Sequence, residues 1–212
     1  EAIIKSLDER SLMTDDLRRG INAAATLAAL EDLYLPYRPK RRTRATIARE
    51  RGLETLAEWL LEAAAGATAG PTAAEVVARA QAHVDPEKEV PGPDEALAGA
   101  RDIIAESVSE NAEVRAELRA LYLDQGQVIS RVARGMEQEG AKFRDYFDWQ
   151  EPVRTAPGHR VLAMRRGERE KFLHMEIAVP EERALVIAAR PFIAPKGPAG
   201  AGACADQVRQ AV

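Results

Sequence analysis

The sequence contains a single cysteine, few aromatic residues and no long apolar run, and each of these shortages narrows what the chain can be. Cys204 has no second cysteine to pair with, which excludes an internal disulfide and a cysteine-based zinc site and leads us to expect a reducing, cytoplasmic setting. No apolar stretch approaches the roughly 20 residues that span a bilayer, and no signal peptide is visible. We therefore predict no membrane partner.

Patterns that carry catalysis are missing as well. None of the three histidines, His83, His159 and His174, lies within helical reach of another histidine or a cysteine at a metal-ligand spacing. The glycine-rich stretch 197–203 follows no strand and lacks the lysine and hydroxyl of a phosphate-binding loop. We predict no catalytic residues, no metal and no cofactor, and we expect that the chain is not an enzyme.

What is present favours helix. The 212 residues are 46% hydrophobic and 30% charged, which is typical of a soluble globular protein with a core of its own. Apolar residues recur at helical spacing, and Thr14, Thr43, Thr72 and Asn111 stand where helix N-caps are expected. The pattern predicts a mainly α fold built as a multi-helix bundle.

Near the end of the sequence the periodicity changes. Short runs at 160–164 and 171–177 flank RRGERE, and we interpret them as a small β-hairpin near residues 159–178. Residues 127–134 are ambiguous between strand and helix.

These patterns divide the chain into four segments. We expect a helical region with a basic loop, central helices, a hairpin element, and a partial helix with a linker: 1–84, 85–152, 153–180 and 181–212. The linker signal is the stretch PKGPAGAGA at 195–203. Because the chain opens without methionine and ends in a helix-like run, we expect a piece of a longer protein, with intramolecular contacts to missing domains.

The most informative stretch is the basic segment, residues 36–51, which holds seven cations against one anion, Glu50. Its prolines stiffen the backbone, so we expect the cations to extend from a rigid segment rather than from a flexible tail. Because the whole chain has a formal net charge of −4, any nucleic-acid binding must be local. Five side chains of the segment are predicted to contact RNA or DNA phosphates: Arg38, Lys40, Arg41, Arg42 and Arg44.

Two further expectations qualify this prediction. Residues 87–117 hold nine anions against three cations, so the basic segment could instead dock on these acidic helices within the same molecule. Tyr34 and Tyr37 are expected to be core residues rather than stacking platforms for bases. A second basic patch contains Arg160, Arg165 and Arg166 on the expected hairpin, where an ordinary solvated tip is the competing interpretation.

Four segments resemble the Tex family of bacterial transcription accessory proteins. They are LEDLYLPYRPKRRTRATIARERGLETLA (30–57), ALAGARDIIAE (96–106), GAKFRDYF (140–147) and PGHRVLAMRRGE (157–168). One departure is Gly158, where the family more often has serine. The resemblance implies a helical region with helix-turn-helix character that precedes an RNase H-like domain, while the family's RNA-binding S1 domain is not within this sequence.

The resemblance also implies a function. We expect a nucleic-acid-binding module, directed largely at phosphates, of a Tex-like transcription accessory protein. The alternative is a protein-interaction scaffold for the transcription machinery, or for the downstream RNase H-like domain, with no nucleic-acid binding of its own.

Overall fold

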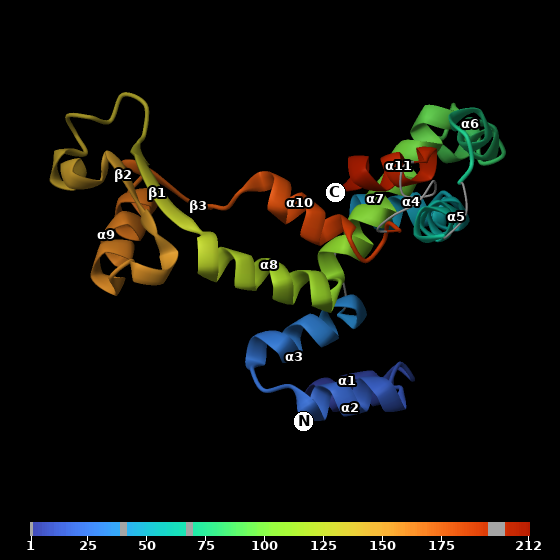
Figure 1. The fold of residues 1–212 in the computed structure, drawn as a ribbon, viewed down its shortest axis with the longest axis horizontal. Coiled ribbons are helices and arrows are strands. Elements are labelled where there is room, and N and C mark those ends of the chain that lie inside the picture. The colour runs from blue at the N-terminus through green and yellow to red at the C-terminus, as the bar shows by residue number, and fades with distance from the viewer. Residues whose placement is uncertain (1, 39–41, 67–69, 195–201) are drawn as a thin grey trace. The chain divides into compact units, whose positions relative to one another are not determined.

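The protein forms two compact units, each described here by itself (Figure 1). The first unit comprises Glu1–Ala116 and Leu185–Val212, and the second comprises Glu117–Ala184. The computed structural model describes residues 2–38, 42–66, 70–194 and 202–212. Most of these residues are helical, which confirms the mainly α fold, whereas the predicted helix-turn-helix character stays a prediction.

The described part of the first unit is helical. Its helices are α1 (Ala2–Glu9), α2 (Asp15–Ala23), α3 (Leu27–Tyr34), α4 (Arg44–Glu50), α5 (Glu54–Ala65), α6 (Ala73–Gln81), α7 (Pro93–Glu110) and α11 (Ala203–Ala211), with 3-10 turns η1 (Leu35–Tyr37) and η2 (Pro86–Lys88). Two more helices, α8 (Ala112–Gln125) and α10 (Glu181–Ala189), begin in one unit and end in the other.

Helix α7 is the centre of the first unit, and α4, α5, α6 and α11 all pack against it. Leu56, Leu60 and Ile104 are fully buried in this core, together with Val208 from the far end of the chain. Gly99 of α7 lets Leu53 approach closely, because an added Cβ would overlap that leucine side chain. The core is therefore built from helices that lie far apart in the sequence.

The predicted helix starts are confirmed by hydrogen bonds from backbone N–H groups to the capping side chains. The four acceptors are Thr14, Thr43, Thr72 and Asn111. Thr72 also forms a capping box with Glu75, whose carboxylate accepts from the Thr72 N–H at 2.8 Å. These contacts satisfy N–H groups that have no partner inside their own helix.

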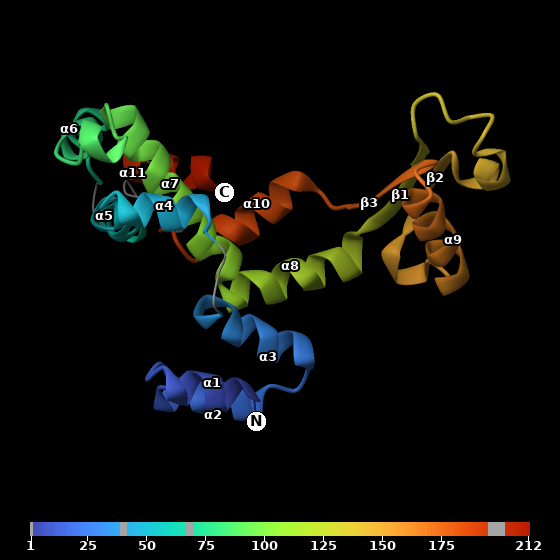
Figure 2. The same ribbon diagram turned by 180° about the vertical axis from the view of Figure 1, so that it is seen from behind.

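The second unit holds a three-stranded antiparallel sheet in the order β2-β1-β3 (Figure 1 and Figure 2). Its elements are β1 (Gln127–Val132), η3 (Ala141–Tyr146), β2 (Asp148–Pro152), η4 (Val153–Thr155), α9 (Gly158–Arg169) and β3 (Leu173–Ala178). In the register, Ser130 of β1 faces Trp149 on one side and Met175 on the other. Of the ambiguous residues 127–134, residues 127–132 thus form a strand.

The hairpin expected near residues 159–178 is wrong in its first arm, because Gly158–Arg169 forms helix α9. Gly167 is not in a turn; it lies inside the helix, and a Cβ there would come within 2.5 Å of Leu173 Cδ1. The second arm is strand β3, but it pairs with β1 rather than with residues 160–164. Leucine, alanine, methionine and arginine in this stretch are good helix formers, and burial of Met164 against the sheet completes the helix.

Within the described ranges, none of the helices combines the length and the apolar character that crossing a bilayer requires. Residues 195–201 of the predicted linker lie outside the described residues, and the linker's end, from Ala203, belongs to α11. The four predicted segments remain a prediction about domain organisation.

Candidate nucleic-acid interface

The front of the basic segment is exposed. Arg38 follows η1 with its side chain in solvent, and Arg42 is exposed and donates to the Glu50 carboxylate at 2.8 Å. Lys40 and Arg41, both predicted phosphate ligands, lie outside the described residues. An exposed ion pair of the Arg42 kind contributes only about 0–1 kcal/mol, so it is easily exchanged for a phosphate contact.

The back of the basic segment docks on the acidic residues of the same molecule. Arg44 Nε lies 3.5 Å from an oxygen of Asp102, although the Arg44 side chain is 87% exposed. Arg51 pairs with Glu89. The intramolecular docking left open by the sequence therefore holds for these two cations.

Arg49 is the strongest of these docking contacts. Its Nη1 donates to Glu106 Oε2 at 2.6 Å, and the Thr43 hydroxyl donates to the same carboxylate at 3.0 Å. Burial acts to lower the pKa of Arg49, but the hydrogen bond and charge of Glu106, followed by those of Glu54, outweigh it and hold that pKa above its ordinary value. Arg49 therefore fastens α4 to α7 as a permanent cation.

The two tyrosines beside the basic segment are half-buried, which falls between the core and stacking interpretations. The Tyr34 hydroxyl lies 3.3 Å from Ser6 Oγ. Close by, Arg115 Nε donates at 2.6 Å to Asp32, a carboxylate whose residue is only 3% exposed. Tyr34 thus lies at a junction of helices, where it lines a hollow of about 420 Å³ together with Asp32, Arg38 and Arg115.

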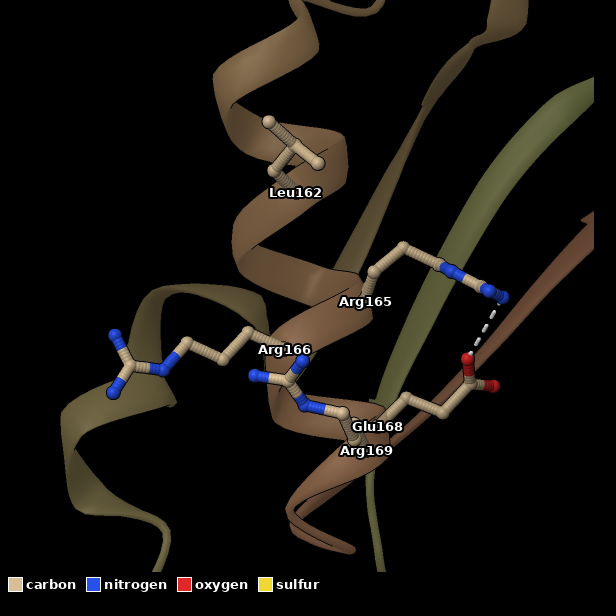
Figure 3. Close-up of a pocket in the computed structure, with 5 residues that line it drawn as sticks. All are labelled: Leu162, Arg165, Arg166, Glu168 and Arg169. Atoms are coloured by element: carbon tan, nitrogen blue, oxygen red, sulfur yellow. Dashed lines mark hydrogen bonds and ion pairs between the residues drawn. The ribbon is translucent and has the colours of Figure 1, made fainter.

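The second basic patch lies on a helix face instead of a hairpin tip. Five residues of α9 line a hollow of about 570 Å³: Leu162, Arg165, Arg166, Glu168 and Arg169. Arg165 Nη1 lies 3.2 Å from Glu168 Oε2. Figure 3 shows that Arg165 extends toward Glu168 at one edge of this face, whereas Arg166 and Arg169 extend away from Glu168. All three arginines are exposed.

The ion pairs of this patch involve Glu168 and Glu170, of which Glu170 also binds a lysine from η3. Arg166 Nε donates to Glu170 at 2.8 Å, and Lys142 donates to the same carboxylate. These two hydrogen bonds hold the pKa of Glu170 below its ordinary value. Because the pairs are exposed or nearly so, they leave the guanidinium groups accessible to a stronger anion.

Arg160, the third predicted ligand of this patch, is placed differently. It lies over the Trp149 ring at 5.1 Å and within 3.3 Å of Glu151, whose side chain is 11% exposed. Its Nε is buried and has no hydrogen-bond partner among the described residues, and the same holds for Trp149 Nε1, Glu151 Oε1 and Ser130 Oγ. Arg160 thus contacts the sheet, and less of it faces solvent than of Arg165 or Arg166.

Sequence reasoning missed Leu162, and it counted Arg169 in the second basic patch without selecting it as a phosphate ligand. Leu162 is 71% exposed, and with Arg165, Arg166 and Arg169 it forms a stripe at i, i+3, i+4 and i+7, which is one face of a helix. This helical spacing was present in the sequence. The hairpin interpretation hid it, because in a strand the residues that share a face are two positions apart. Among the described residues, no three His, Cys, Asp or Glu side chains gather as a metal would require.

Comparisons with known proteins agree with this architecture. Residues 72–197 match the family model described as Tex central region-like. The chain is 43% identical over 178 residues to "Protein tex" of Bordetella pertussis, 46% over 177 residues to "Protein YhgF" of Escherichia coli, and 43% over 175 residues to "Transcriptional accessory protein Tex" of Neisseria gonorrhoeae.

These matches cover 84%, 84% and 82% of this chain, in the same order, but only 22% of each relative. The chain therefore spans about a fifth of the length of the curated relatives that it matches. The family model covers more than half of the chain, and the quoted relatives share over two fifths of the aligned residues. The resemblance inferred from the four sequence segments is thus confirmed: this chain belongs to the Tex family.

Proposed function

We propose that this chain is a nucleic-acid-binding module of a transcription accessory protein and that it holds RNA or DNA mainly through phosphates. A relative from Neisseria gonorrhoeae carries the name transcriptional accessory protein, which supports the transcription-related role. The observation that carries the binding role is the α9 face, defined as Leu162, Arg165, Arg166 and Arg169, with three exposed guanidinium groups on one helix.

Arginine is suited to this task because its planar fork bonds two phosphate oxygens and keeps its charge at every physiological pH. Glu168 and Glu170 compete for the forks through ion pairs whose arginines are exposed and whose carboxylates are partly exposed, and pairs near the surface contribute about 0–1 kcal/mol each. Phosphate binding also releases the counterions condensed on nucleic acid, and this gain carries much of the affinity. We propose no catalytic role for the chain.

The front of the basic segment, which belongs to the first unit, is a second and separate candidate for phosphate contacts. Arg38 and Arg42 are exposed, so they remain candidates together with Lys40 and Arg41. Arg44 is exposed but already lies beside Asp102, so we assign it a smaller contribution.

The test is a fluorescence anisotropy titration of the chain against labelled RNA and DNA at several salt concentrations. Replacing Arg165, Arg166 and Arg169 together by alanine is expected to weaken binding and to flatten the slope of log K against log salt by about two to three units, since each phosphate contact contributes about 0.7 to 0.9. The parallel variant Arg38→Ala/Arg42→Ala is expected to flatten it by about one to two units.

The matched control is Arg18→Ala/Arg19→Ala, because these two arginines lie on α2 and form ion pairs only with Asp8 and Asp16 among the described residues. The control should leave the salt slope unchanged. A wild-type chain that binds neither RNA nor DNA at low salt would overturn the proposal.

A second candidate function is a protein-interaction scaffold without nucleic-acid binding of its own. It is favoured by the docking of Arg44, Arg49 and Arg51 on acidic side chains, because cations used inside the molecule are not offered to a ligand. The same titration separates the two, since the scaffold predicts no salt-dependent binding.

A further inference from the structure

The α9 face combines features that plain phosphate binding does not require. Leu162 is 71% exposed at one end of a cationic stripe (Figure 3), and an exposed apolar side chain contributes nothing to electrostatic attraction for phosphates. It lies one turn before Arg165 and Arg166 and two turns before Arg169, so all four side chains share one face. Such a face offers an apolar contact followed along the helix by three bidentate hydrogen-bond donors, with the Glu168 carboxylate lining the same hollow.

The helix that carries this face is firmly seated. Met164 is fully buried on its inner side, and Gly167 brings the backbone so close to Leu173 that a Cβ would lie 2.5 Å from Cδ1. Near the other end of α9, Arg160 is held by the Trp149 ring and the Glu151 carboxylate. The outer side chains are therefore displayed from a rigid support, which limits the entropy lost on binding.

We infer that α9 is a recognition helix that lies in the major groove of double-stranded DNA, an inference that rests on the proposed nucleic-acid-binding function. An α-helix with its side chains is about 10–12 Å across, which fits the roughly 12 Å major groove of B-DNA. Its 12 residues extend for about 18 Å, which corresponds to about five base pairs.

The side chains of the α9 face match what this groove presents. An arginine fork bonds the O6 and N7 acceptors of guanine, and an aliphatic side chain packs on the thymine methyl group. Arg165, Arg166 and Arg169 also have the reach and charge for the phosphates that flank the groove. Charge complementarity and the apolar contact thus point to the same partner.

Other nucleic acids fit less well. The major groove of A-form RNA is deep and too narrow for side chains to read, so a helix cannot enter it. Single strands are usually held by stacking their bases on aromatic rings, and α9 contains no phenylalanine, tyrosine or tryptophan. Duplex DNA is therefore the partner that these residues favour.

The test compares three labelled probes at one salt concentration: a 16-base-pair DNA duplex, an RNA duplex of the same sequence, and the DNA single strands. The chain is expected to bind the DNA duplex about tenfold or more tightly than either other probe, because only that groove admits the helix. Leu162→Ala should weaken DNA-duplex binding about fivefold through lost apolar burial and leave the other two affinities unchanged.

Leu123→Ala is the matched control, since Leu123 is a 59% exposed leucine on α8 of no assigned role, and it should change none of the affinities. Both leucines are exposed, so neither replacement disturbs a core. Equal affinity for the three probes, or a Leu162→Ala variant with wild-type DNA binding, would overturn the inference while leaving phosphate binding intact. Absence of binding to every probe would instead remove the proposed function and the inference together.

Discussion

Arg49 and Arg115 in the first unit are used differently from Arg165 and Arg166 in the second. In the first unit, Arg49 reaches a Glu106 side chain that is only 10% exposed, and Arg115 reaches the buried Asp32, so each cation joins two helices. In the second unit, the described partners of Arg165 and Arg166 are carboxylates three and four residues further along the chain, although Arg160 of the same helix contacts the sheet. The difference shows that the number of cations does not give the positive charge available to a partner. An arginine that is paired with a buried carboxylate of the same molecule is not available to an external anion.

The largest effect that we expect comes from Gly167→Leu, which should destabilise the second unit by about 3 kcal/mol. A leucine there would collide with the buried Leu173 and lift α9 from the sheet. Urea unfolding followed by circular dichroism measures the loss. Gly158→Ala is the control: nothing lies within 4 Å of its added Cβ, so we expect a gain of up to about 0.5 kcal/mol from helix propensity.

The Gly167→Leu variant also tests whether the two units keep their structures independently of each other. Burial raises the pKa of the Cys204 thiol in α11 to about 11, so this thiol should react slowly with alkylating reagents while the first unit is folded. We expect Gly167→Leu to leave Cys204 protected. Rapid labelling of Cys204 in that variant would show that the two units do not hold their structures separately.

The outcome for α9 shows where sequence reasoning stops. Helix starts such as Thr72 with Glu75 were predictable because the cap and the N–H groups that it serves lie within three residues. The hairpin was wrong because β3 pairs with β1, as where Leu173 faces Val132, and no local pattern announces a partner about forty residues away. Residues 160–164, which local turn signals had assigned to a strand, form part of helix α9 that packs on the sheet.

The candidate site shows the same limit. The basic segment was visible as composition, since its cations are neighbours in the chain. That Arg49 would meet Glu106, 57 residues away, could be offered only as a general docking alternative. Leu162 and Arg169 became part of a face only once residues 158–169 were known to be a helix.

The next effect in size concerns the internal use of arginine in the first unit. Glu106→Ala should cost about 1–3 kcal/mol, because Arg49 and Thr43 both lose the acceptor that holds α4 on α7. Glu54→Ala removes the other partner of Arg49, but the Glu54 side chain is 55% exposed, so we expect only about 0–1 kcal/mol. Equal losses in the two variants, measured by thermal unfolding, would mean that burial does not distinguish the two contacts.

The smallest effect is a dependence of stability on pH, which both units should share. Backbone and side-chain hydrogen bonds from Thr72 lower the pKa of Glu75, as bonds from Lys142 and Arg166 lower that of Glu170. A lowered folded pKa contributes stability above the unfolded value, about 4.5, and this contribution disappears as the pH falls through the folded pKa.

Unfolding curves between pH 7 and pH 3 measure this term. Glu75→Gln and Glu170→Gln should each be less stable than the wild type at pH 7, with the difference shrinking as the pH falls below about 4.5. Glu58→Gln, at an exposed position of α5, is the control and should run parallel to the wild type. A constant difference at every pH for Glu75→Gln would assign the loss to the capping geometry alone.

The division of the chain into two units also determines the order in which their parts are synthesised. The sequence leaves the first unit within α8 and re-enters it within α10, and the last helix, α11, packs on α5 and α7. During synthesis, the ribosome therefore completes residues 117–184 of the second unit before it makes α11, which packs on α5 and α7 of the first. All residues of the second unit are therefore synthesised before Val208, which is buried in the same core as Leu60 and Ile104.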